Sequence, residues 1–148
     1  MKSIFVSDLH GREEHYEKLF QYIIHKKPEV VFMGGDLLPN YHVHAPPEFI
    51  NDFLRVSLDA LKKEMETDYP DIIAILGNDD PAITIPMFRE LGEHGFLKYL
   101  ENSVITVRGI QTAGYPFVPP TPFMLKDWEK YDVSRYVPRE SVSPEEGI

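Results

Sequence analysis

Three short apolar runs, separated by segments with helical periodicity, constrain the fold of this chain more than any other feature. The runs are residues 3–7 (SIFVS), 29–33 (EVVFM) and 72–76 (IIAIL). Nearly continuous apolar character is typical of parallel strands that are buried on both faces of a sheet. The order strand–helix–strand–helix–strand therefore predicts an α/β fold, in which right-handed crossovers join a mostly parallel sheet flanked by helices.

Helices are predicted between the strands and beyond the third one. The first presents one apolar face at helical spacing and ends before Pro28, which cannot continue a helix. The second presents a longer apolar face, made of Phe49, Ile50, Phe53, Leu54, Leu58, Leu61 and Met65. A shorter helix is predicted over residues 85–94, and a pair of strands over 104–107 and 110–113 is predicted to form a hairpin.

The character of the chain changes after residue 114. Residues 115–148 concentrate prolines and aromatic side chains and contain no further strand pattern. Such a segment is either a long loop that packs against other parts of the protein or a flexible end. We therefore divide the chain into a body, residues 1–114, and a tail, residues 115–148, which Trp128 and Tyr131 are expected to anchor by packing.

Composition excludes several classes of protein. The 148 residues suffice for one domain with a core, and no apolar run approaches the roughly 18 residues that a membrane-spanning helix needs. The formal net charge of −9 argues against a broad nucleic-acid-binding face, which would be basic. The N-terminus lacks the long apolar stretch of a signal peptide, so we expect a cytoplasmic protein. The absence of Cys excludes thiolate metal ligands.

Side chains that bind metals follow each of the three strands. They are Asp8 and His10 after the first strand, Asp36 after the second, and Asn78, Asp79 and Asp80 after the third. Parallel strands end at one edge of a sheet, so these side chains are expected to share one crevice. Carboxylate and imidazole groups suit divalent ions such as Mn, Fe, Zn, Co and Ni. Each motif alone also fits a helix cap or a tight turn, but their order after three successive strands predicts a metal site.

The order D-x-H, G-D and G-N, each after a strand, resembles the calcineurin-like metallophosphoesterase superfamily. The resemblance implies a four-layer αββα sandwich that binds two divalent metal ions and hydrolyses phosphate mono- or diesters with a metal-activated water. By this resemblance Asp8 and His10 would bind the first ion. Asp36 would bridge both ions, and Asn78 would bind the second.

Three departures from the family pattern affect the expected activity. Asp79, followed by Asp80, stands where the family has a histidine that acts as general acid, so these two carboxylates are the candidate catalytic residues. Pro39 stands where the family has a second aspartate. The family also takes metal ligands from later histidines, whereas the only histidine after Asn78 is His94, inside a predicted helix. The resemblance thus implies a truncated N-terminal half that holds one metal ion or none and is impaired in hydrolysis.

Two other interpretations stay open. One is a non-catalytic fragment or regulatory module that keeps the fold. The other is a HAD-like or response-regulator-like domain with Asp8 as phosphoacceptor, although HAD enzymes need an aspartate where this chain has His10. If half of the sandwich is absent, one apolar sheet face would be uncovered, so we expect self-association or a partner protein over that face.

Overall fold

A parallel four-stranded sheet lies at the centre of the protein, in a computed structural model that describes residues 1–148. Its strands follow one another in the order β1-β2-β3-β4, and all neighbouring pairs are parallel. The strands are β1 (Ser3–Val6), β2 (Val30–Gly34), β3 (Asp71–Ile75) and β4 (Lys98–Tyr99). The first three confirm the predicted strands to within a residue or two. The strand β4 was not predicted, because two residues are too few to show a strand pattern in the sequence.

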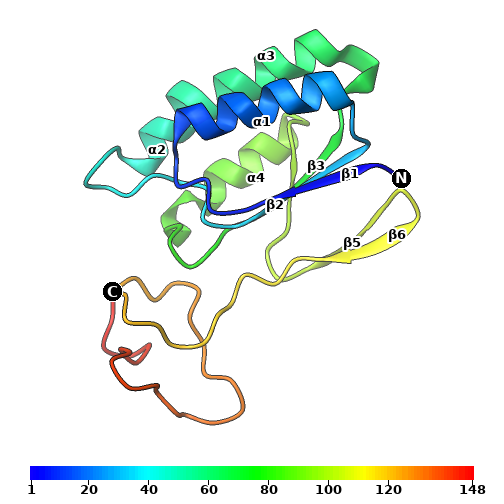
Figure 1. The fold of residues 1–148 in the computed structure, drawn as a ribbon. Coiled ribbons are helices and arrows are strands. Elements are labelled where there is room, and N and C mark those ends of the chain that lie inside the picture. The colour runs from blue at the N-terminus through cyan, green and yellow to red at the C-terminus, as the bar shows by residue number, and fades with distance from the viewer.

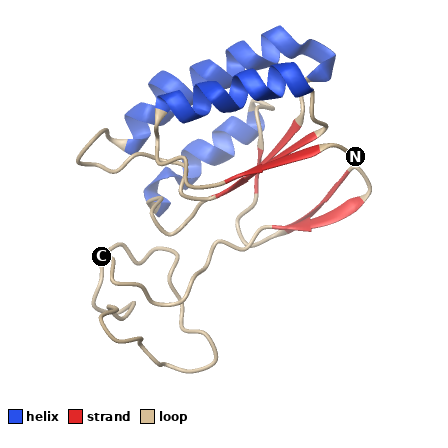
Figure 2. Cartoon of the chain, in the orientation of Figure 1, coloured by secondary structure: helices blue, strands red, loops and turns tan.

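The helices all cover the same face of this sheet (Figures 1 and 2). They are α1 (Glu13–Lys26), α2 (Pro46–Phe49), α3 (Arg55–Met65) and α4 (Ile85–Glu93). A π-helical turn at Ile50–Leu54 joins α2 to α3. The second predicted helix is therefore continuous, but its first half is not a regular α-helix. None of the helices combines the length and the apolar composition needed to cross a membrane. The predicted α/β fold, with a mostly parallel sheet flanked by helices, is confirmed.

The main core lies between the helices and the sheet. Alternate strand residues point into it, such as Val31 and Met33 of β2, because successive side chains of a strand face opposite sides. Tyr16, Phe49 and Phe88 are its largest fully buried side chains. The rings of Tyr16 and Phe49 lie 5.6 Å apart, so α1 and the start of the second helical stretch share one aromatic contact.

The opposite face of the sheet is only partly covered, by a hairpin of β5 (Val104–Val107) and β6 (Ile110–Ala113). Val107 packs there against Val30 and Ile73 in a small second core. Arg108, at the hairpin turn, also pairs with Asp71 at 3.1 Å. The expectation that the strands are buried on both faces is therefore wrong for β1, where Phe5 remains 68% exposed because the hairpin does not cover it.

The tail forms no helix or regular strand, and it packs on itself and on the body. A single parallel bridge joins Val118 to Glu129, and Trp128 is buried at 4% exposure against the main core. Inside the tail, Lys126 pairs with Glu129 at 2.7 Å, with both side chains almost fully buried. Packing of Trp128 is confirmed. The boundary between residues 114 and 115 stays a prediction.

Candidate metal centre

Three turns meet at the carboxyl edge of the sheet, one after each of β1, β2 and β3. The first two turns continue the strand pairing beyond the sheet. The Asp8 N–H donates to the Gly35 carbonyl at 3.0 Å, and the His10 N–H donates to the Asp36 carbonyl at 2.9 Å. The backbone therefore fixes Asp8, His10 and Asp36 side by side, although 26 to 28 positions separate the first two from the third in the sequence.

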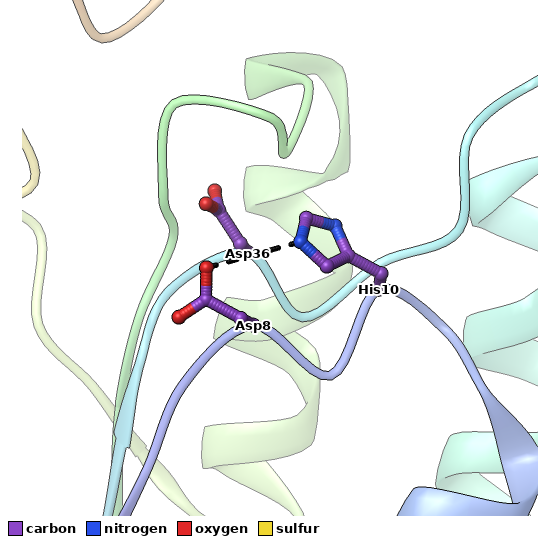
Figure 3. A group of neighbouring side chains, drawn as sticks. All are labelled: Asp8, His10 and Asp36. Carbon is purple, nitrogen blue, oxygen red and sulfur yellow. Dashed lines mark ion pairs between the residues drawn. The ribbon is translucent and has the colours of Figure 1, made fainter.

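The side chains of Asp8, His10 and Asp36 converge, as Figure 3 shows. One ligand atom from each lies within 4.8 Å of the ligand atoms of the other two. The contact drawn in Figure 3 joins His10 Nε2 to Asp8 Oδ1 at 3.8 Å. Two carboxylates and one imidazole at this spacing fit a borderline divalent cation, which would also relieve the repulsion between the two negative charges.

All three residues of this cluster have left-handed backbone conformations, with φ of 57° at Asp8, 47° at His10 and 54° at Asp36. A residue with a Cβ atom adopts this region at a cost of roughly 1 kcal/mol or more, because Cβ approaches the following carbonyl oxygen. Such strain persists where surrounding contacts fix it, and it gathers at functional sites. The strain here coincides with the cluster of Asp8, His10 and Asp36.

Two glycines allow the second and third turns to touch. A Cβ atom at Gly77 would lie 2.3 Å from Asp36 Oδ1, and one at Gly35 would lie 2.8 Å from the Gly77 Cα atom. Neither contact is sterically possible, so both positions require glycine. The glycines of the G-D and G-N motifs thus bring the Asp36 carboxylate against the turn that carries Asn78.

Asp79 contacts two members of the cluster. Its backbone N–H donates to Asp36 Oδ1 at 2.9 Å, and its Oδ2 atom lies 3.3 Å from His10 Nδ1. Asn78 lies between Gly77 and Asp79, both of which touch Asp36, so the third turn places Asn78 beside the cluster. The six predicted site residues therefore lie in one region of the protein, but they do not have equivalent surroundings.

Asp80 is fully buried beneath the cluster. Its carboxylate accepts hydrogen bonds from the backbone N–H groups of Leu37 at 3.0 Å, Leu38 at 2.8 Å and Gly77 at 2.8 Å. Burial raises the pKa of the Asp80 carboxyl to about 6, although the three N–H donors lower it. Asp80 therefore links the turn after β2 to the turn after β3, and no part of its carboxylate is open to a ligand.

Two aromatic residues that the sequence did not mark as part of the site support it from below. The Tyr16 hydroxyl donates to the Leu37 carbonyl at 2.8 Å, and the Trp128 indole N–H donates to the Asp80 carbonyl at 2.7 Å. Burial, with a smaller effect of the nearby Asp80 charge, raises the pKa of Tyr16 well above its usual value. No local pattern reveals such contacts, because they join segments that are 21 and 48 positions apart.

The sequence resembles one described protein family along nearly its whole length. The family model of the calcineurin-like phosphoesterases matches residues 1–145. No curated protein matches the chain. Several solved structures match the chain, and one of these crystal structures matches at 17% sequence identity and a TM-score of 0.47, over 73% of this chain. The match covers 49% of that protein, so the present chain spans about half the length of the structure it matches.

Proposed function

Because this chain belongs to the calcineurin-like phosphoesterase family, we propose that it is a metal-dependent enzyme that hydrolyses phosphate mono- or diesters. The observation that supports this proposal most directly is the cluster of Asp8, His10 and Asp36, with its ligand atoms within 4.8 Å of one another. The side chains have the oxygen and nitrogen donors that Mn, Fe, Zn, Co or Ni accept. Manganese is our first choice for the assay.

Each residue of the cluster has its own part in the proposed site. Asp8 and His10 would hold one ion, and Asp36 would be shared with a second ion that Asn78 also binds. When bound, the ions would supply a water of lowered pKa as nucleophile and neutralise charge on the phosphoryl oxygens. The Asp8 side chain is 65% exposed, which leaves the cluster open to a substrate from solvent. The acidic side chains would repel a phosphate ester in the metal-free protein and attract it once cations are bound.

The test is hydrolysis of p-nitrophenyl phosphate and bis(p-nitrophenyl) phosphate by chelator-treated protein, with and without added Mn²⁺. We expect hydrolysis that depends on the metal and falls at least about tenfold in Asp36→Asn, which keeps the shape of the side chain but loses its charge. Asp52→Asn, on an exposed position of the π-helical turn, is the matched control and should keep full activity. Metal-independent hydrolysis, equal in Asp36→Asn and the unmodified protein, would contradict the proposal.

A metal-binding module without hydrolytic activity is the second candidate. The observation in its favour is that His10 is the one histidine in the cluster, while His94 caps the end of α4 and lies with its ring 5.9 Å from that of Phe96. Calorimetry of Mn²⁺ binding separates the candidates. Binding that is lost in Asp36→Asn, without hydrolysis of either ester, would favour the module.

A further inference from the structure

We propose that Asp79 is a positioning residue for His10. Its carboxylate holds the imidazole in the tautomer that carries its proton on Nδ1, which leaves Nε2 free to bind a metal ion. The inference rests on the proposed function, because it assigns a role to a side chain beside the proposed metal ligands. It gives Asp79 no contact with a substrate and no proton to transfer.

The two ring nitrogens of His10 face two different carboxylates. Nε2 lies 3.8 Å from Asp8 Oδ1, within the metal-binding cluster, and Nδ1 lies 3.3 Å from Asp79 Oδ2. Figure 3 shows the cluster side of this arrangement, with one ring nitrogen directed at Asp8. The ring is therefore placed between the cluster and the Asp79 side chain.

The chemistry of imidazole assigns different tasks to these nitrogens. A neutral imidazole has one N–H donor and one nitrogen with a free electron pair, and only the latter binds a metal. A carboxylate accepts hydrogen bonds and has no proton to donate when it is ionised. Asp79 Oδ2 lies 3.3 Å from Nδ1, nearer than Asp8 Oδ1 lies to Nε2 at 3.8 Å, so the proton is favoured on Nδ1. In many metal sites a carboxylate orients a ligand histidine in this way and raises its basicity.

Asp79 is placed to orient His10, and it lies outside the set of ligands itself. The side chains whose donor atoms all lie within 4.8 Å of one another are Asp8, His10 and Asp36, and Asp79 is not among them. Its own position is fixed by its backbone, since its N–H donates to Asp36 Oδ1 at 2.9 Å. The main chain of Asp79 thus contacts the Asp36 carboxylate, while its side chain lies beside the imidazole of His10.

The separation of main-chain and side-chain contacts makes a clean variant possible. Asp79→Ala removes the carboxylate and keeps the N–H that binds Asp36. The Asp79 side chain is 41% exposed, so its removal opens no core cavity and the variant is expected to fold. Asp79→Asn is the conservative variant, because its amide oxygen can still accept a hydrogen bond from Nδ1. Glu14→Ala is the matched control, because Glu14 lies 3.8 Å from Nε2 of another half-exposed histidine, His15.

The first measurement is nitrogen NMR of the histidine rings in metal-free protein at a fixed neutral pH, with the His10 signals identified by their loss in His10→Gln. We expect His10 to carry its proton on Nδ1 in the unmodified protein and in Asp79→Asn, and to shift toward the Nε2–H tautomer in Asp79→Ala. Glu14→Ala should leave the His10 signals unchanged. An unaltered tautomer in Asp79→Ala would overturn the inference, whether or not the protein hydrolyses any ester.

The second measurement is the dissociation constant of Zn²⁺ by calorimetry, which needs no substrate. We expect Asp79→Ala to weaken binding by about 10- to 100-fold, Asp79→Asn to recover most of the loss, and Glu14→Ala to bind like the unmodified protein. Equal losses in Asp79→Ala and Asp79→Asn would overturn the inference. They would show that metal binding depends on the negative charge of Asp79 and not on a hydrogen bond from Nδ1. A failure of the proposed function would look different. The tautomer and the Zn²⁺ affinities would be as expected here, but the protein would hydrolyse neither ester.

Discussion

Asp8, His10 and Asp36 each combine two properties, a side chain that can bind a metal ion and a left-handed backbone conformation. The three side chains converge while their backbones hold this conformation. The conformational cost, roughly 1 kcal/mol or more per residue, is borne by the metal-free protein. A bound ion would offset this cost, since it would stabilise only the folded state.

Replacing His10 by Gly or by Ala separates the strain from the ligand. Both variants lose the imidazole, but only glycine adopts φ of 47° without a Cβ clash. In the presence of a chelator, we expect the free energy of unfolding of His10→Gly to be about 1 kcal/mol higher than that of His10→Ala. The order should be opposite for Lys18→Gly and Lys18→Ala in the middle of α1, where glycine costs about 0.5–1 kcal/mol. Urea unfolding followed by circular dichroism measures the stability of all four variants. Equal stability of His10→Ala and His10→Gly would show that the backbone at position 10 is not strained.

The residues of the cluster could be predicted from sequence, whereas their conformations could not. Strand-forming runs before Asp8, Asp36 and Asn78 suffice to place them at one edge, because parallel strands end together. A left-handed φ at Asp8 or His10 has no local signature, since it is imposed by hydrogen bonds to the turn after β2. The burial of Asp80, which the sequence groups with Asp79, likewise depends on backbone donors 42 and 43 positions away.

At the level of structural elements, two hydrogen bonds join the tail to the segment after β3, next to the cluster of Asp8, His10 and Asp36. Trp128 donates to the Asp80 carbonyl, and the Asp80 carboxylate holds the turns after β2 and β3. Asp127 strengthens the junction by accepting a hydrogen bond from the Ala82 N–H at 2.7 Å. A movement of the tail at Trp128 would therefore change the turn that carries Asn78 and Asp79.

Trp128→Phe tests this connection, because it keeps an aromatic ring but removes the indole N–H. The Asp80 carbonyl would lose its partner in a buried position, so we expect the free energy of unfolding to fall by about 1–3 kcal/mol. Amide exchange of Gly77 to Asp80 should become faster in the same variant. Tyr131→Phe, which removes a tail hydroxyl that bonds to Glu145, is the matched control and should leave exchange at these amides unchanged. Unchanged exchange in Trp128→Phe would show that the tail does not support the site.

The agreement between sequence pattern and structure differs among the elements. The hairpin was predicted at the bounds found, since alternating apolar residues flank a tight turn. The apolar stripe from Phe49 to Met65 predicted a single helix, but an extra residue per turn at Ile50–Leu54 interrupts it. The place of Trp128 could not be predicted, because a proline-rich segment has no periodicity that indicates its buried side.

For the molecule as a whole, the main asymmetry is between the two faces of the sheet. The helices bury one face, and the hairpin leaves part of the other open around Phe5. A cavity of about 100 Å³ lies there between the sheet and the hairpin, lined by Phe5, Phe32 and Leu100 among others. Exposed apolar surface of this kind is often covered by another protein surface. Self-association through this face accordingly stays our prediction.

Phe5→Thr is the variant that tests self-association, since threonine keeps the strand propensity but removes most of the apolar surface. We expect light scattering to give a mass above 17.1 kDa for the unmodified protein, and a lower mean mass for Phe5→Thr at the same concentration. Tyr41→Thr is the matched control, because Tyr41 is similarly exposed but lies in the loop before α2. A monomer mass for the unmodified protein at every concentration would contradict the prediction.

The strand order β1-β2-β3-β4 has a consequence for synthesis on the ribosome. Each strand pairs with the one made just before it, so the growing chain never has to wait for a later segment to insert between strands. The residues of the cluster, and Asn78 to Asp80 beside it, are all synthesised once residue 80 has been added, before α4 and the tail. Trp128 arrives last and closes the underside of a centre that is already built.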